Sequence, residues 1–161
     1  MDIWVIDFEA SGLSKKSYPI EVGITNGAEH YTALIKPMSH WTYWEAEAEK
    51  VHNIVRDKTM KNGEDALSVA IKLNNILKTS KIYCDNIQWD AFWLNVLFSD
   101  NAISPTFHIL DLKDILKTGR QWRLFESKME EIEKSNLYRK HRALDDAKVI
   151  QSSLRYALEQ K

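Results

Sequence analysis

The sequence predicts a mixed α/β fold, in which a five-stranded sheet begins as an antiparallel meander, continues with parallel strands and carries helices on both faces. Two observations predict this class. Segments of strand length come first, and Asn26-Gly27, a strong hairpin signal, separates two of them. Segments of helical periodicity then alternate with short strand-like runs, which is typical of helices packed against a sheet.

Five segments have the composition of strands. The first is a nearly continuous apolar run, as in a strand buried on both faces. The second alternates apolar and polar residues, and Pro37 ends the third. The predicted strands are Ile3–Phe8, Ile20–Thr25, His30–Ile35, Lys81–Cys84 and Phe107–Leu110.

Six segments follow the helical period, with apolar side chains recurring every three or four residues. The clearest is Asp65–Leu77, where six apolar side chains form one stripe. The predicted helices are Glu45–Val51, Asp65–Leu77, Trp89–Phe98, Asp111–Lys117, Phe125–Glu133 and Ala143–Leu158.

Composition narrows the class of protein. The 161 residues suit one domain over residues 1–161, and 44% hydrophobic residues exclude a disordered chain. A formal net charge of −1 excludes a global positive field, so contact with nucleic acid must be local. The single cysteine, Cys84, cannot form an internal disulfide. The acidic N-terminus is unlike a signal peptide, and no apolar run approaches a membrane span. We expect a soluble, cytoplasmic protein that does not bind membranes.

Asp7 and Glu9 form the first candidate site. Side chains two apart on a strand share a face, so both carboxylates stand together at the end of an apolar strand. Such a pair is costly unless a cation neutralises it, and oxygen ligands suit Mg²⁺ or Mn²⁺. A strand that simply ends in solvent explains this pair equally well.

Two further acidic positions are ambiguous when taken alone. Asp90 lies in the first turn of a predicted helix, where the helix dipole favours an acid. In the stretch HRALDDAKV, Asp145 would lie about 40° round a continuous helix from His141, and Asp146 about 140°. Helix geometry alone therefore favours Asp145. However, residues 138–140 look like loop, which would start the helix near Arg142 or Ala143 and place His141 before it.

Taken in order, Asp7, Glu9, Asp90, His141 and Asp146 resemble the DEDDh family of 3′→5′ exonucleases, which has a ribonuclease H-like fold. Proofreading exonucleases, oligoribonuclease and exonucleases of the exonuclease X type belong to it. The resemblance covers nearly the whole chain and includes Lys36-Pro37 and the stretch Val51–Ile54.

The chain departs from the family pattern at three positions. Asp85 and Trp89 stand where the middle motif commonly has histidine and phenylalanine, and Asn53 stands where glycine is usual. These departures leave the metal-binding positions filled and affect the surrounding loops.

The resemblance implies roles for these residues. Asp7, Glu9, Asp90 and Asp146 would hold two divalent cations, Mg²⁺ or Mn²⁺, and Asp7 would bridge them. His141 would be the general base, a task that suits imidazole because it titrates near neutral pH. The family spacing selects Asp146 as the ligand in place of Asp145.

The resemblance also suggests the substrate and the residues that bind it. The strand would be single-stranded or 3′-ended DNA or RNA, short oligonucleotides included. Ala10 and Ser11 would meet the terminal 3′-hydroxyl, and Trp44 and His52 would be further substrate contacts, although core packing explains Trp44 at least as well. The sequence indicates a monomer or a homodimer and does not reveal a partner protein.

Basic residues exceed acidic ones locally, nine to six between positions 111 and 142. Lys113, Lys117, Arg120 and Arg123 could face a phosphate backbone, or could form an ordinary solvated face.

Two rival functions remain. One is a non-catalytic nucleic-acid-binding or adaptor domain on the same fold, which should have lost ligand positions. The other is a ribonuclease H-type endonuclease, against which the histidine spacing speaks.

Overall fold

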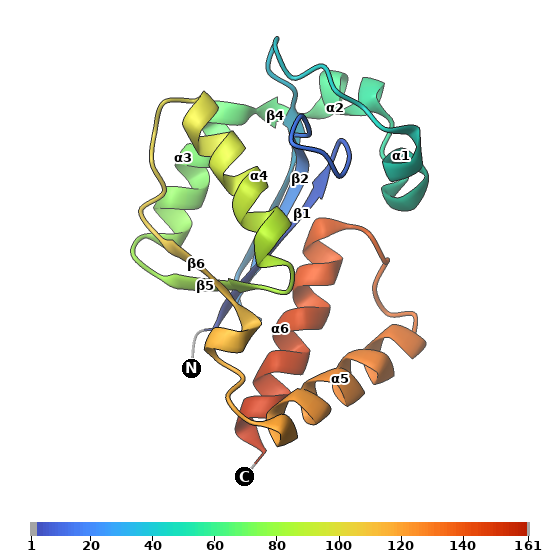
Figure 1. Cartoon of the computed structure of the whole chain (residues 1–161), viewed down its shortest axis with the longest axis vertical. Helices are drawn as coiled ribbons and strands as arrows, with labels where there is room; N and C mark the ends of the chain where they lie inside the picture. The colour runs from blue at the N-terminus through green and yellow to red at the C-terminus, as the bar shows by residue number, and fades with distance from the viewer. Residues whose placement is uncertain (1–2, 161) are drawn as a thin grey trace.

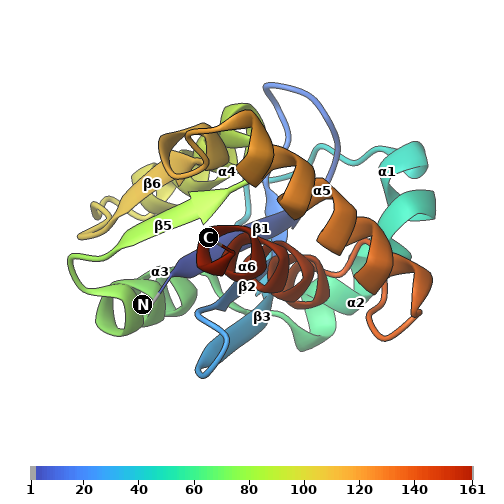
Figure 2. The same ribbon diagram turned by 90° about the horizontal axis from the view of Figure 1, so that it is seen from below.

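The computed structural model describes residues 3–160 and has a six-stranded sheet with helices on both faces (Figures 1 and 2). The strand order is β4-β3-β2-β1-β5-β6. The strands are β1 (Trp4–Ala10), β2 (Pro19–Thr25), β3 (His30–Lys36), β4 (Glu64–Asp65), β5 (Lys81–Cys84) and β6 (His108–Asp111). The helices are α1 (Ala46–His52), α2 (Arg56–Asn62), α3 (Ala66–Leu77), α4 (Ile87–Asp100), α5 (Gly119–Lys134) and α6 (Ala143–Glu159), with a 3₁₀ turn, η1, at Leu112–Asp114.

The pairing of the strands confirms the predicted mixed sheet. β1, β2 and β3 form an antiparallel meander, and β5 and β6 continue the sheet from β1 in parallel. The strand count differs, because β4 adds a two-residue parallel pairing at the far edge. A strand of two residues has no period for a sequence to reveal.

Two helix predictions need correction. The segment Asp111–Lys117 forms only the short turn η1, because Asp111 caps it and a new helix begins soon after. That helix, α5, begins at Gly119, ahead of the predicted Phe125, because Thr118 and Gln121 form a capping box. Helix α2 was not predicted, since it buries only Thr59 and therefore has no apolar stripe.

The alternation of side chains along β1 separates two apolar layers. Trp4, Ile6 and Phe8 pack in the larger core with α3 and α4, whereas Val5 packs in the second core under α6. Asp7 and Glu9 are in phase with Val5. Their carboxylates therefore lie on the face that α6 covers (Figure 2).

Gly23 allows α6 to approach the sheet closely. It pairs with Asp7 across the β1–β2 ladder. A Cβ atom at this position would overlap the backbone of Ala143 and Leu144. The first turn of α6 therefore rests on bare strand backbone, beside the carboxylates of β1.

None of the helices between residues 3 and 160 combines the length and the apolar composition that crossing a membrane requires.

Candidate active site

A pocket of about 420 Å³ lies where β1, α4 and α6 meet and holds all five residues of the predicted catalytic set. β1 supplies Asp7 and Glu9 to it, and α4 supplies Asp90. His141 and Asp146 come from the start of α6 and the loop before it. Residues up to 139 positions apart in the sequence thus line one cavity.

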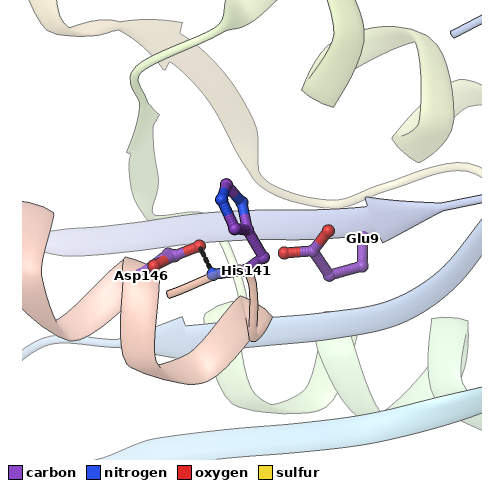
Figure 3. A group of neighbouring side chains, drawn as sticks. All are labelled: Glu9, His141 and Asp146. Carbon is purple, nitrogen blue, oxygen red and sulfur yellow. Dashed lines mark hydrogen bonds between the residues drawn. The ribbon is translucent and has the colours of Figure 1, made fainter. Parts of the chain in front are cut away.

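The polar side chains of this pocket form two groups. Ligand atoms of Glu9, His141 and Asp146 lie within 4.8 Å of one another, and Figure 3 shows these three residues gathered beside β1. Those of Asp7, Asp85 and Asp90 form a second group within the same distance. The arrangement therefore offers two adjacent places where oxygen atoms converge.

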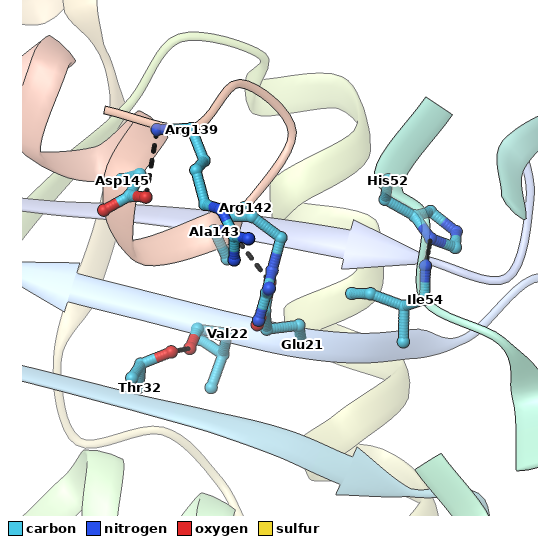
Figure 4. Close-up of polar contacts among 9 residues, drawn as sticks. All are labelled: Glu21, Val22, Thr32, His52, Ile54, Arg139, Arg142, Ala143 and Asp145. Atoms are coloured by element: carbon cyan, nitrogen blue, oxygen red, sulfur yellow. Dashed lines mark hydrogen bonds and ion pairs between the residues drawn. The ribbon is translucent and has the colours of Figure 1, made fainter. Parts of the chain in front are cut away.

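The two adjacent aspartates point to different places. The Oδ2 atom of Asp146 accepts the His141 N–H at 2.9 Å, inside the active-site pocket (Figure 3). Asp145 instead accepts the Arg139 N–H at 3.1 Å and lines a separate pocket (Figure 4). As predicted, His141 lies in the loop before α6, and its backbone is left-handed with φ 59°. Such a conformation is uncommon for a residue other than glycine and is often found at functional sites.

An ion pair that the sequence analysis did not find anchors this loop. Arg142 donates to both carboxylate oxygens of Glu21, at distances of 2.5–3.2 Å (Figure 4). Glu21 also accepts the Ala143 N–H at 3.0 Å, so it satisfies a free donor at the helix start. Glu21 is 3% exposed on β2, directly opposite Glu9. The loop that carries His141 is therefore fixed to the sheet next to the carboxylates.

The structure adds Asp85 to the site. The sequence analysis named this residue only as a departure from the family pattern, and it follows directly after β5. Its carboxylate joins the group of Asp7 and Asp90. The available signal was that Asp85 ends a strand parallel to β1, because adjacent parallel strands bring their carboxyl ends to the same edge of a sheet.

Burial and mutual repulsion raise the pKa of the clustered carboxyls. Burial, followed by the neighbouring Asp90 and Glu9, raises the pKa of Asp7 well above its usual value. Burial is also the main cause at Glu9 and Asp90, whose pKa rises to about 8 at each, and at Asp146, whose pKa rises to about 6. Without a positive charge, the cluster holds protons near neutral pH.

Asp90 has a buried carboxylate oxygen whose surroundings suit a cation. It is 2% exposed, and its Oδ2 atom has no hydrogen-bond partner within the described residues. A buried carboxylate oxygen without a partner is costly unless something else neutralises it. The carboxylate oxygens of the two groups are the donors that suit divalent cations such as Mg²⁺ or Mn²⁺.

A second, more apolar pocket of about 260 Å³ adjoins the first, and the two share Phe8, Glu9 and Trp93. Ala10 and His52, two of the predicted substrate contacts, line it. Trp93 belongs to the larger core. It is indeed 7% exposed, yet it also forms a wall of both pockets.

The other two predicted substrate contacts lie behind this pocket. The Ser11 N–H donates to the Tyr18 carbonyl, and the Ser11 hydroxyl accepts the Tyr18 N–H. The Ser11 carbonyl accepts the Glu45 N–H. The Trp44 indole donates to Glu49 at 2.7 Å, and its ring packs edge-on against His52. Ser11 and Trp44 therefore support the pocket wall and are not part of it.

His52 has one ring nitrogen engaged. Its Nδ1 atom accepts the Ile54 N–H at 3.0 Å (Figure 4), whereas Nε2 has no partner among residues 3–160. Burial lowers the pKa of His52, which favours the neutral form of the ring. The Nε2 atom is itself buried, and the ring interacts with the Ala10 backbone.

With this geometry in view, the comparison with protein families is decisive. The exonuclease family RNase_T matches residues 4–152, which is nearly the whole chain. The chain belongs to this exonuclease family. No sequence among curated proteins matches it.

The exonuclease fold also matches solved structures of exonuclease I. The enzyme from Methylocaldum szegediense superposes with a TM-score of 0.76 at 16% identity, covering 99% of this chain and 40% of that one. A zinc-bound complex of E. coli exonuclease I with single-stranded DNA gives 0.72 at 15% identity, covering 96% and 39%. Its complex with a dA16 oligonucleotide gives 0.71 at 15%, covering 93% and 39%. This exonuclease chain spans about two fifths of the length of these proteins.

Family membership confirms the predicted identification as a DEDD-type exonuclease with a ribonuclease H-like fold. The family is one of exonucleases, and the clustered acidic residues of this chain offer ligand atoms of the kind that hold divalent metal ions.

Proposed function

We propose that this exonuclease removes nucleotides one at a time from the 3′ end of a single-stranded nucleic acid and releases nucleoside 5′-monophosphates. One observation carries the proposal: His141 and the carboxylates converge in a pocket that shares three lining residues with an apolar pocket at Ala10. The first pocket suits the scissile phosphate, and the second has room for the terminal nucleoside.

The cation sites follow from the two groups of side chains. Asp7, Asp85 and Asp90 would hold one Mg²⁺ or Mn²⁺, and Glu9 with Asp146 would hold the other. Bound cations would supply positive charge that offsets the negative charge developing on the phosphate oxygens. The raised pKa values of Glu9 and Asp90 support this assignment, because each carboxylate gains a partner for its charge.

His141 would act as the general base in place of a ligand. It is exposed and precedes α6, so its ring reaches the pocket from the solvent side. The ring nitrogen accepts a proton from water as the water oxygen forms a bond to phosphorus. The bond from phosphorus to the 3′-oxygen of the penultimate nucleotide breaks, and solvent protonates that oxygen. The phosphate leaves on the 5′-oxygen of the released nucleotide.

The substrate strand is the finer part of the proposal. Stacking of the terminal base against Phe8 or Trp93 requires an unpaired end, which favours single strands. The solved complexes of E. coli exonuclease I contain single-stranded DNA, so DNA is the first substrate to test and RNA the comparison.

The test is a time course with a 5′-labelled single strand in Mg²⁺ or Mn²⁺, as matched DNA and RNA. We expect stepwise shortening from the 3′ end, release of 5′-monophosphates, and no reaction in EDTA. Internal cleavage of a strand with a blocked 3′ end would indicate an endonuclease. Binding without cleavage in either metal would indicate an adaptor domain.

A further inference from the structure

A basic pocket lies beside the candidate active site, between the α1–α2 segment and the loop that joins α5 to α6. It has a volume of about 470 Å³, and its lining residues are His52, Asn53, Lys58, Arg139, Lys140 and Arg142. Four of these six residues are lysine or arginine. The chain as a whole has a formal net charge of −1, so this concentration of positive charge is local.

The basic pocket shares a lining residue with each of the two pockets of the candidate active site. Lys140 also lines the pocket of the carboxylates, and His52 also lines the apolar pocket at Ala10. A strand bound with its 3′ end in the active site would therefore have the basic pocket beside it.

Among the described residues, two of the four basic side chains in the pocket form ion pairs with acidic residues, and two do not. Arg142 is neutralised by Glu21, and Lys140 pairs with Glu133 at 2.8 Å. Lys58 and Arg139 are exposed, and neither side chain has a carboxylate partner within residues 3–160 (Arg139 is shown in Figure 4). These two side chains keep their positive charge available to an anion.

The anion that fits is a phosphate. Lysine and arginine side chains are the usual phosphate ligands of nucleic-acid-binding proteins, and the amide of Asn53 adds a neutral donor. The basic residues considered from sequence, Lys113, Lys117, Arg120 and Arg123, do not line this pocket.

The direction of the strand follows from the proposed function, on which this inference rests. The terminal nucleoside of a 3′→5′ exonuclease substrate ends in a free hydroxyl, so every phosphate besides the scissile one lies on its 5′ side. We propose that the basic pocket binds a backbone phosphate of the substrate strand, 5′ of the scissile bond, through Lys58 and Arg139.

The first experiment measures binding without cleavage. In an Asp146→Asn background, the affinity for a fluorescent single strand is measured across a salt series, with and without Lys58→Gln and Arg139→Gln together. We expect about tenfold weaker binding and a salt slope smaller by about 0.7, the value for one lost phosphate contact on a single strand. The control is Lys61→Gln, on the same helix, because Lys61 is exposed and paired with Asp57.

The second experiment separates this inference from the proposed function. The 4-nitrophenyl ester of thymidine 5′-monophosphate has one phosphodiester and no further phosphate. We expect the Lys58→Gln/Arg139→Gln enzyme to hydrolyse it at the wild-type rate, yet to lose about tenfold in kcat/KM on an oligonucleotide. If wild-type protein cleaves neither substrate, the proposed function fails. If it cleaves both and the double variant matches it on both, the basic-pocket inference fails alone.

A third comparison identifies the source of the phosphate. A dinucleotide with a 5′-phosphate is compared with one without, and an unphosphorylated oligonucleotide supplies internal phosphates only. If the 5′-phosphate raises kcat/KM for the wild-type enzyme but not for the double variant, a terminal phosphate binds in the pocket. If only the longer strand raises kcat/KM, and the double variant again lacks this increase, an internal phosphate binds there. The inference is wrong if neither gain depends on Lys58 and Arg139.

Discussion

The two sides of the candidate active site are held in different ways. The carboxylates of β1 and α4 stand on a central strand and a packed helix, and Asp90 is 2% exposed. His141, in contrast, lies on an exposed loop with a left-handed backbone. Hydrogen bonds and ion pairs, chiefly from Arg142 to Glu21, hold that loop in place. Because the two sides are held by different contacts, we expect that a substitution on one side can impair metal binding or proton transfer without impairing the other.

The largest effect should come from the adjacent aspartates at the start of α6. Asp146→Asn keeps the size of the side chain and removes the charge that a cation needs, so we expect no measurable turnover and weaker Mn²⁺ binding. The metal-free variant should be no less stable, because one of several repelling carboxyls is gone. The matched control is Asp145→Asn, which should keep most of the activity because Asp145 faces a separate pocket. The opposite result in parallel turnover assays and Mn²⁺ titrations would reverse the assignment.

His141→Ala tests the loop side alone. We expect turnover to fall by roughly 10²- to 10⁴-fold, as when a general base is lost. Mn²⁺ affinity should remain near the wild-type value, because the carboxylates stay in place. Single-turnover kinetics together with Mn²⁺ titration measure the two effects. Near-normal turnover would show that the histidine is only structural.

Glu21→Gln tests the connection between the two sides. It removes the charge opposite Arg142, which is 29% exposed, so we expect a loss of about 1–2 kcal/mol in the free energy of unfolding. The kcat should fall more than Mn²⁺ affinity, because the His141 loop moves while Asp7 and Asp90 do not. Glu29→Gln, at an exposed position of the neighbouring hairpin, is the control. Equal loss of kcat and metal affinity would mean that the two sides are not separable.

Asp85→Asn should have a smaller effect, and that effect should fall on metal binding by the carboxylates. We expect Mn²⁺ affinity to fall by at least about tenfold, because that is the smallest loss typical even of residues that only support a metal ligand, and Asp85 would be a ligand itself. The thermal stability of the metal-free protein should rise slightly, since Asp85 repels Asp7 and Asp90. Calorimetric Mn²⁺ titration and thermal melts follow both effects. Unchanged Mn²⁺ affinity would remove Asp85 from the ligand set.

The smallest effect is a pH dependence of stability on the carboxylate side. The pKa of Glu9 is raised from 4.5 to about 8, so the folded state binds protons more tightly than the unfolded chain. This contribution to stability is complete below pH 4.5 and is lost as the pH rises through 8. We expect the Tm of the metal-free protein to fall between pH 5 and 9, and saturating Mn²⁺ to reduce that fall. A metal-free Tm that rises over this range would contradict the pKa of Glu9.

The sequence predicted the parts of the molecule that repeat a local pattern. The apolar run of β1 gave that strand, and period-two spacing put Asp7 and Glu9 on one face. Lys81–Cys84 was predicted with the bounds that β5 has. Helix α2 was missed because it buries a single side chain and has no period.

Contacts across the sheet were beyond local reasoning. Glu21 forms an ion pair with Arg142, which lies 121 positions later, and no local sequence pattern around either residue predicts this contact. Lys58 and Arg139 likewise come together only in the fold. The sequence identified the chemistry-bearing residues by their order along the chain, whereas the loop anchors and the basic pocket depend on tertiary packing.

The bare backbone of Gly23 has a consequence for how relatives of this chain can diverge. Because the backbone of Ala143 and Leu144 rests on that residue, and Ala143 is fully buried, neither position 23 nor position 143 has room for a larger side chain. A larger residue at either position would lift the helix that carries Asp146, without touching a catalytic side chain. We therefore expect substitutions at positions 23 and 143 to be correlated among relatives, because a larger residue at either position requires a change in how α6 packs on the sheet.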